Sequence, residues 1–207
     1  TAHPDYFPLY TEEGKWQHGK QSWTNWCEGF LGGMMWIFAR RTSDPAWRER
    51  AEHYARLVEE RQHDTSVHDL GFVFWSTWKR WFDQTGDEQV NARVIQAGST
   101  MGLRFNEEGK FLRSFVAPES CFIDIMMNVG IIFYAANERG DADLLRRATE
   151  NCLTTRRDAA TCEAVDEWRA EVQEEGPPLD ATDRPAIQQE CDPTFGNSDI
   201  WAWSGPD

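Results

Sequence analysis

The chain has 207 residues, of which 40% are hydrophobic and 27% are charged, a balance that is ordinary for a globular domain with a sizeable core. Its formal net charge of −14 at pH 7 makes it a poor candidate for binding nucleic acid or an anionic membrane surface. No stretch reaches the ~18 apolar residues of a membrane span, so a membrane protein is not expected either.

The first predicted pair of helices covers residues 22–62. Ser22–Thr42 shows helical spacing of its apolar residues and carries few charges. The sequence Ser43-Asp44-Pro45 then supplies a helix cap and a proline suited to a first helical turn. Pro45–Gln62 is charged and amphipathic, so it is expected to bury one side only. That apolar side is formed by Trp47, Ala51, Tyr54 and Val58.

The same order of an apolar helix, a break and a more polar helix returns twice along the chain. The second copy consists of residues 72–84, 86–87 and 88–105, and the third consists of residues 123–139, 140–141 and 142–157. The breaks contain Asp44, Asp87 and Asp141, at intervals of roughly 40–55 residues. Repeats of this period indicate stacked helical pairs.

The two helices of each pair differ in polarity in a consistent way. The first is apolar nearly all round and is expected to be buried on all sides, whereas the second has one apolar stripe and is expected to lie outside. Inner and outer helices in alternation predict an all-α fold, an (α/α) toroid, with three hairpins evident over residues 22–157. A tetratricopeptide-like solenoid is the competing architecture, but both of its helices would be amphipathic. The large side chains expected to be buried on inner helices are Trp36, Phe74, Trp78, Met127 and Phe133.

The repeats divide the chain after Arg157. Residues 1–157 are predicted to form a partial (α/α) barrel. Residues 158–207 are predicted to be a divergent, largely irregular C-terminal segment of the same domain. Within them, Asp158–Glu175 has the pattern of a short helix, Gly176-Pro177-Pro178 stops it, and the remainder is rich in Pro, Asp, Thr and Gly.

In a toroid of hairpins all inner helices run in one direction, so residues at their starts gather at one rim. Three groups have that position here: Trp26 with Glu28, His68-Asp69, and Asp124. Two carboxylates at the mouth of an all-α barrel are suited to cleaving glycosidic bonds, because the charge of one raises the pKa of the other and lets it act as an acid. The alternative is that Asp69 and Asp124 merely cap their helices and that His68 is a structural hydrogen-bonding residue.

The cysteines indicate the compartment. There are five, an odd number, and no two form a C-x-x-C pair. This usage favours a reducing compartment, with neither a zinc site nor a disulfide framework. The first ten residues also lack the basic and apolar regions of a signal peptide, so a cytoplasmic location is expected.

Three segments near the starts of the predicted inner helices resemble the motifs of one enzyme family. Residues 26–36, WCEGFLGGMMW, are similar to the W-x-x-G-F-W-P-G-M-L-W segment of unsaturated glucuronyl hydrolases. Residues 68–72, HDLGF, match the family's H-D-L-G-F, and residues 124–128, DIMMN, match its D-x-M-M-N. The resemblance covers about residues 5–157, with the motifs in the family's order.

The resemblance implies an (α/α) toroid of the six-hairpin type, and residues 1–157 would be its catalytic domain. It also implies a metal-free glycoside hydrolase that needs no cofactor. Such an enzyme acts on unsaturated uronyl oligosaccharides left by polysaccharide lyases, and it removes 4,5-unsaturated glucuronic acid from their non-reducing end. Asp124 would be the general acid and base, with Asp69 as its charged neighbour. The sugar would be held by His68, Trp26 and Asn128.

The implied reaction differs from ordinary glycoside hydrolysis, because the C4=C5 double bond of the sugar forms a vinyl ether with the ring oxygen. Protonation at C4 creates an oxocarbenium-like centre at C5, and water adds there. The hemiketal that results then opens and releases the rest of the oligosaccharide. One carboxyl group can deliver the proton and afterwards activate the water.

Three alternatives remain open from the sequence. Unsaturated rhamnogalacturonyl hydrolases share the fold and the chemistry, although HDLGF together with DIMMN favours the glucuronyl side. An inactive carbohydrate-binding remnant is favoured by residues 158–207, which do not match the family's later H-Q-G stretch. A purely structural scaffold leaves the convergence of Asp69, Asp124 and Trp26 unexplained. Because three hairpins alone leave apolar inner helices uncovered, we also expect the chain to self-associate and to have little activity by itself.

Overall fold

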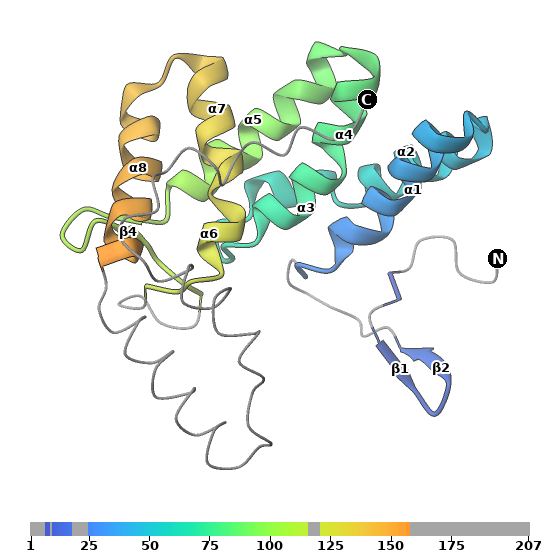
Figure 1. Ribbon diagram of the computed structural model, residues 1–207, viewed down its shortest axis with the longest axis horizontal. Helices are drawn as coiled ribbons and strands as arrows, with labels where there is room; N and C mark the ends of the chain where they lie inside the picture. The colour runs from blue at the N-terminus through green and yellow to red at the C-terminus, as the bar shows by residue number, and fades with distance from the viewer. Residues whose placement is uncertain (1–6, 9, 18–24, 116–120, 158–207) are drawn as a thin grey trace, which may run out of the picture. The chain divides into compact units, whose positions relative to one another are not determined.

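The computed structural model describes residues 7–8, 10–17, 25–115 and 121–157 (Figure 1). Within these residues, three helical hairpins follow one another in the order that the repeats predict, and the all-α prediction is confirmed. The predicted helix start at residues 22–24 and the whole of residues 158–207 lie outside the described residues.

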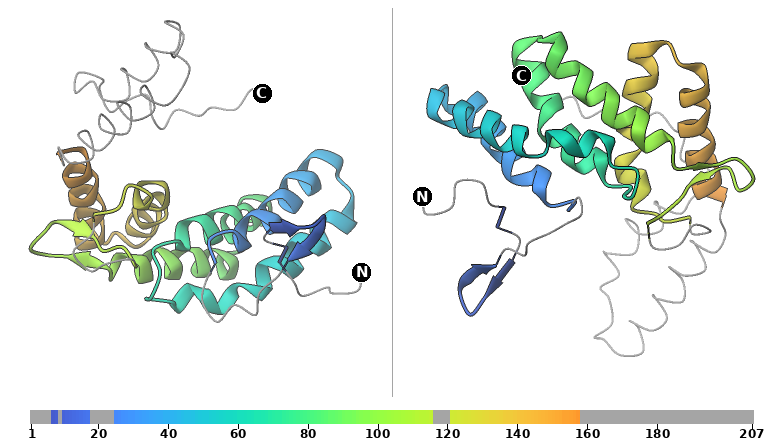
Figure 2. Two further views of the ribbon diagram at one scale, coloured as in Figure 1. Left: turned by 90° about the horizontal axis from the view of Figure 1, so that it is seen from below. Right: turned by 180° about the vertical axis from the view of Figure 1, so that it is seen from behind.

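Each hairpin combines an inner and an outer helical part. The inner parts are α1 (Glu28–Thr42), α3 (Leu70–Ser76) with α4 (Trp78–Thr85), and α6 (Ile125–Asn128) with α7 (Gly130–Arg139). The outer parts are α2 (Pro45–Leu57) with the 3-10 helix η1 (Glu59–His63), α5 (Glu88–Gly102) and α8 (Ala142–Arg157). In both views of Figure 2, as in Figure 1, α5 runs alongside α4 and α7, and α3 packs against both α1 and α6.

The outer helices begin as the sequence predicts. Asp44, Asp87 and Asp141 each accept a hydrogen bond from a backbone N–H in the first turn, at 2.9, 2.8 and 3.0 Å. Gly86 and Gly140 precede two of them with φ angles of 65° and 62°, a left-handed conformation that glycine adopts without strain. These turns end each inner helix and start each outer one.

Two of the inner helices are interrupted, whereas the sequence pattern predicts continuous helices. The second is broken at Thr77, whose φ and ψ are −107° and −78°. The buried Thr77 hydroxyl donates to the Val73 carbonyl at 2.7 Å and so competes with the regular helical bond there. The third is divided at Val129, between α6 and α7.

Tryptophans fill the core between the first two hairpins. Trp36, Phe74 and Trp78 are buried, as predicted, and Phe133 is half-buried. The Trp78 indole donates to the Ala55 carbonyl at 2.9 Å, which joins the second inner helix to the first outer one. The Trp36–Trp81 and Trp78–Trp81 ring centroids are 5.7 and 5.1 Å apart. These indoles therefore serve packing rather than ligand stacking.

The predicted burial of Met127 is wrong, because its side chain is 73% exposed. The short helix α6 packs on α3 and α7 through Ile125 and Asn128, and Met127 lies on another side of the helix. The inner helices are likewise not buried all round in the described part of the chain. Exposed apolar side chains on them include Met34, Ile37, Phe38 and Trp75.

Short strands, which the sequence pattern does not predict, form two hairpins. One pairs β1 (Tyr10–Glu12) with β2 (Lys15–Gln17), and the other pairs β3 (Phe105–Asn106) with β4 (Phe111–Leu112). The helix predicted to reach Phe105 therefore ends at Gly102, in α5.

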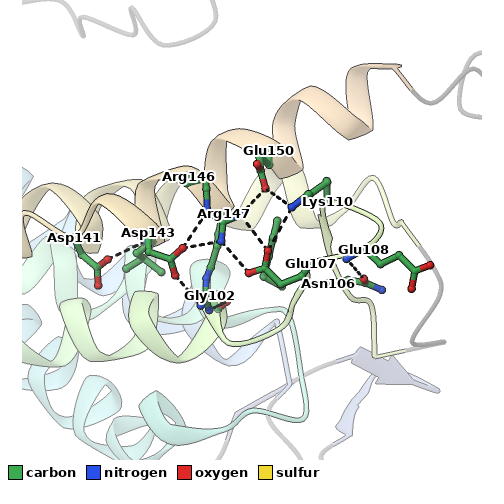
Figure 3. Close-up of polar contacts among 12 residues, drawn as sticks. Gly102, Asn106, Glu107, Glu108, Lys110, Asp141, Asp143, Arg146, Arg147 and Glu150 are labelled. Atoms are coloured by element: carbon green, nitrogen blue, oxygen red, sulfur yellow. Dashed lines mark hydrogen bonds and ion pairs between the residues drawn. The ribbon is translucent and has the colours of Figure 1, made fainter.

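The β3–β4 hairpin is tied to α8 by an ionic cluster, which Figure 3 shows. Arg146 of α8 contacts Glu107 of the hairpin at 2.8 Å, and its own helix neighbours Asp143 and Glu150 at 2.6 and 2.7 Å. Below this exposed cluster, the buried Asn151 side chain accepts from the Leu112 N–H at 2.8 Å. The segment that follows β4 is thereby held in place. Among the described residues, we find no helix whose length and apolar character would let it cross a membrane.

Candidate active site

Glycines bring the starts of the three inner helices into contact. A Cβ atom on Gly29 of α1 would lie 2.4 Å from the Phe72 carbonyl oxygen of α3, and one on Gly71 of α3 would lie 2.6 Å from the Asn128 Cα of α6. Any side chain at either position would force the helices apart. The glycine in each of these two motifs is therefore required for the approach of the helices that carry the polar residues.

Asn128 fastens α3 to α6. Its side chain is buried, its Oδ1 accepts the Phe72 N–H at 2.7 Å, and its Nδ2 donates to the Asp124 carbonyl at 3.3 Å. These bonds fix the backbone next to Asp124. The predicted contact of Asn128 with a sugar stays a prediction, since the structure gives its oxygen and its nitrogen partners within the protein.

His68, Asp69 and Asp124 come together at the starts of α3 and α6. The His68 Nε2 lies 3.2 Å from the Asp124 Oδ2 and 3.5 Å from the Asp69 Oδ1. One polar atom from each of the three residues falls within 4.8 Å of the others. Residues from two different repeats, far apart in the sequence, thus form one constellation at the predicted place.

The two carboxylates have different environments. Asp69 is 2% exposed, and its Oδ2 has no hydrogen-bond partner, whereas the Asp124 side chain is 32% exposed. Burial, the charge of Asp124 and a hydrogen bond with it raise the pKa of Asp69 to about 7. The pair therefore retains one proton near neutral pH, next to a carboxyl group that solvent reaches.

His68 is neutral in this setting. Burial lowers its pKa, and this outweighs the opposite influence of Asp124. The Phe115 N–H donates to the His68 Nδ1 at 3.3 Å, so the ring hydrogen of the neutral imidazole is on Nε2, facing the carboxylates. A nitrogen that carries hydrogen has no lone pair for a metal ion. The three residues are close enough to surround a cation, but this tautomer of His68 does not suit one.

Partly exposed aromatic side chains lie beside the carboxylates and His68. Trp26, which is 46% exposed, packs against Phe30 and Phe72 with ring centroids 5.7 and 5.9 Å away. Phe115 and Phe122 flank the His68 ring and are themselves partly exposed. Exposed aromatic faces beside paired carboxylates suit the apolar faces of a sugar ring.

Several neighbours of the site are not among the residues predicted from sequence. Arg104, just after α5, lies near Asp69, and its charge partly offsets the rise in the pKa of that carboxyl. Phe115 lies in the connection between hairpins, which has no periodic pattern that would single it out. Glu28, which the sequence places near Trp26, is buried 3.9 Å from the Arg61 guanidinium, and burial raises its pKa.

No protein-family model matches the chain. Among curated proteins, it is 28% identical over 137 residues to an unsaturated glucuronyl hydrolase of Formosa agariphila, covering 63% of this chain and 34% of that protein. It is 24% identical to an unsaturated glucuronyl hydrolase of a Bacillus species, covering 74% and 43%. It is 23% identical to an unsaturated chondroitin disaccharide hydrolase of Streptococcus pneumoniae, covering 57% and 32%.

Solved structures agree on the fold. The crystal structure of a heparin-specific unsaturated glucuronyl hydrolase matches with a TM-score of 0.67 at 21% identity, covering 75% of this chain and 42% of that one. The Bacillus enzyme matches with a TM-score of 0.68 at 23% identity, covering 75% and 44%. These structures have the (α/α) toroid fold that the sequence predicts.

The chain spans between about a third and under half of the length of the curated relatives it matches. Over that shared part, the chain is similar in sequence and in fold to the unsaturated glucuronyl hydrolases.

Proposed function

We propose that the protein is a glycoside hydrolase that removes 4,5-unsaturated glucuronic acid from the non-reducing end of lyase-generated oligosaccharides. The observation that carries this proposal is the pairing of buried Asp69 with the more exposed Asp124 at the starts of two inner helices. One relative in the structural comparison is complexed with an unsaturated disaccharide, dGlcA-GalNAc6S. The names of the relatives also favour the glucuronyl over the rhamnogalacturonyl alternative.

In the proposed reaction Asp124 is the residue that touches substrate, because its carboxyl group is the exposed member of the pair. It delivers to C4 of the unsaturated sugar the proton that it shares with Asp69, which leaves an oxocarbenium-like centre at C5. The Asp124 carboxylate then takes a proton from the water that adds to C5. The hemiketal opens and releases the remaining oligosaccharide, and the carboxyl pair again holds one proton.

Asp69 has a supporting role in this proposal. It lies out of reach of solvent, and its raised pKa keeps one proton in the pair at neutral pH. The family resemblance implies that Trp26, His68 and Asn128 hold the sugar, and of these the exposed ring of Trp26 suits the role best.

The test is the loss of ultraviolet absorbance of an unsaturated uronyl disaccharide, measured with a longer protein in which the barrel is complete, and the reaction is also run in heavy water. We expect deuterium at C4 of the product. The Asp124→Asn variant should lose activity by a factor of about a thousand or more, because an amide of nearly the same shape cannot transfer the proton. Asp83→Asn, a change of the same kind at an exposed position on α4, is the control and should keep wild-type activity. Binding of the disaccharide without turnover by the wild type would favour the carbohydrate-binding alternative instead.

We also propose that the chain, expressed by itself, self-associates. Apolar side chains on the inner helices, among them Met34, Trp75 and Met127, are exposed on the described part of the molecule. Light scattering should give a mass above that of one chain, and Met34→Ser with Trp75→Ser should lower it. Leu145→Ser removes an exposed apolar side chain from outer helix α8 and should leave the mass unchanged. A monomeric wild type would contradict the proposal.

A cytoplasmic location belongs to the same proposal. Cys27, Cys121 and Cys152 are free thiols, which is the state that a reducing compartment maintains. Thiol titration of protein isolated under alkylating conditions would test it, and cysteines protected from alkylation by a disulfide bond would argue against it.

A further inference from the structure

The His68 side chain is enclosed on every side by the protein. It is 1% exposed, the Phe115 ring stacks on it with centroids 4.6 Å apart, and the Phe122 ring lies 5.7 Å away. Its Nδ1 accepts from the Phe115 N–H, and its Nε2 faces the carboxylates of Asp124 and Asp69. Neither ring nitrogen is left for a sugar hydroxyl.

We propose that His68 is a positioning residue rather than a sugar ligand: a neutral imidazole whose Nε2–H holds the Asp124 carboxylate against Asp69, in a tautomer set by the Phe115 amide. The proposal rests on the function proposed above for Asp124. It replaces the role that the family resemblance implies for His68.

The Phe115 amide is well placed to set the tautomer, because the backbone before it is fixed. The Arg113 N–H donates to the Arg104 carbonyl at 3.0 Å, and the Arg104 Nε donates to the Arg113 carbonyl at 2.7 Å. The Leu112 N–H is held by Asn151 of α8, next to the ionic cluster of Figure 3. The third hairpin thus holds the donor that orients a histidine of the second.

The charges that face the ring explain why its neutrality matters. Asp69 and Asp124 lie on its Nε2 side, and the charge of Arg104 helps to lower its pKa. The charge of Asp69 also raises the pKa of the Cys27 thiol. An imidazolium at this position would stabilise both carboxylates in their ionised forms and would drive the proton out of the pair. A neutral N–H donor instead stabilises one negative charge and leaves one proton in place.

The first experiment compares His68→Leu with His68→Gln in the same complete-barrel protein, since Gln can present an amide N–H near the position of Nε2. Without a donor, ionisation of the carboxyl pair is less favourable, so in His68→Leu the basic limb of the pH–kcat profile should move up by about one pH unit or more. We expect kcat to fall about 10-fold to 100-fold, with KM changed less than about threefold. His68→Gln should return the limb to within a few tenths of a unit of the wild-type position. A raised KM with an unmoved limb in both variants would mean that His68 binds sugar.

The second experiment does not depend on turnover. Nitrogen NMR of chain labelled at histidine, with the His68 signals assigned by their loss in His68→Gln, reports the tautomer and the charge directly. We expect the neutral Nε2–H form over a range around neutral pH, because the pKa of His68 is lowered by burial. An imidazolium or an Nδ1–H form in that range would overturn the inference, even if the enzyme turns over. The expected tautomer in a complete-barrel protein without hydrolase activity would overturn only the proposed function.

Discussion

Aspartates stand at the starts of both the inner and the outer helices, but they do different things there. Asp44 and Asp87 have extended backbones and accept a first-turn N–H of α2 and α5. Asp69 and Asp124 hold the equivalent positions before α3 and α6 and make no such bond. Their carboxylates are directed instead toward each other and toward His68.

The difference shows that the cap interpretation of Asp69 and Asp124 fails on geometry. A capping carboxylate satisfies its helix and is chemically inert, since its charge is used by the backbone N–H groups. A carboxylate at the same position that forgoes the cap must be stabilised elsewhere. For Asp69 that stabilisation is incomplete, because one of its buried oxygens has no hydrogen-bond partner. An unsatisfied buried group of this kind costs stability and indicates a functional role.

The largest expected effect that sharpens the comparison comes from Asp69→Asn. We expect kcat to fall by about a hundredfold or more, because the pair can no longer share a proton. We expect the same substitution to raise the free energy of unfolding at and above neutral pH. The pKa of Asp69 is raised from 3.8 to about 7, so the stability contributed by its protonated form is full below about pH 4 and is lost as the pH rises through about 7.

Asn does not ionise, so the stability of the variant does not have this pH dependence. The free energy of unfolding of Asp69→Asn minus that of the wild type should therefore be about 1–3 kcal/mol larger at pH 8 than at pH 5. Thermal unfolding at the two pH values measures this. Equal effects of the substitution at both would show that Asp69 is already ionised at pH 5 in the folded protein.

The next effect concerns the activity of the wild type. Because the proposed reaction needs one proton in the carboxyl pair, kcat/KM should fall about tenfold for each pH unit above the pKa of Asp69, which is about 7. The pH profile of kcat/KM for an unsaturated uronyl disaccharide reports this pKa in the enzyme without substrate. A flat profile up to pH 9 would mean that the proton donor is not a member of this carboxyl pair.

The smallest effect is expected at an outer helix. Asp87→Ala removes the cap of α5 and should destabilise the protein by about 1 kcal/mol, while kcat and KM stay at wild-type values. Chemical denaturation and steady-state kinetics check the two halves of this prediction. A large loss of activity in Asp87→Ala would mean that inner and outer aspartates are not functionally distinct.

The sequence predicted what depends on local pattern. Polarity alternates between helices, and Gly-Asp or Ser-Asp-Pro breaks recur, so the three hairpins and the capping role of Asp44 could be derived. The convergence of Asp69 with Asp124 followed from the common direction of the inner helices.

What the sequence did not predict depends on contacts between segments that have no periodic pattern. Met127 is an apolar residue on an inner helix, which predicts burial, but a four-residue helix buries only the side that meets its neighbours. Phe115 cannot be predicted from sequence because it acts through its backbone N–H, a group that every residue except proline has. The break at Thr77 depends on a side-chain bond that helical spacing does not reveal.

The close approach of backbones at Gly29 and Gly71 shows that the glycines and the aspartates of the motifs are required for different reasons. The glycines are fixed by the distance between backbones, and they would be needed whether or not the protein turned over any substrate. The aspartates are not needed for that approach, and Asp69 destabilises the folded state at neutral pH because its pKa is raised. A lineage released from selection for activity is therefore expected to keep both glycines and to lose Asp69 early. The residue found two positions before the glycine of the second motif in other genomes would then distinguish enzymes from their inactive descendants.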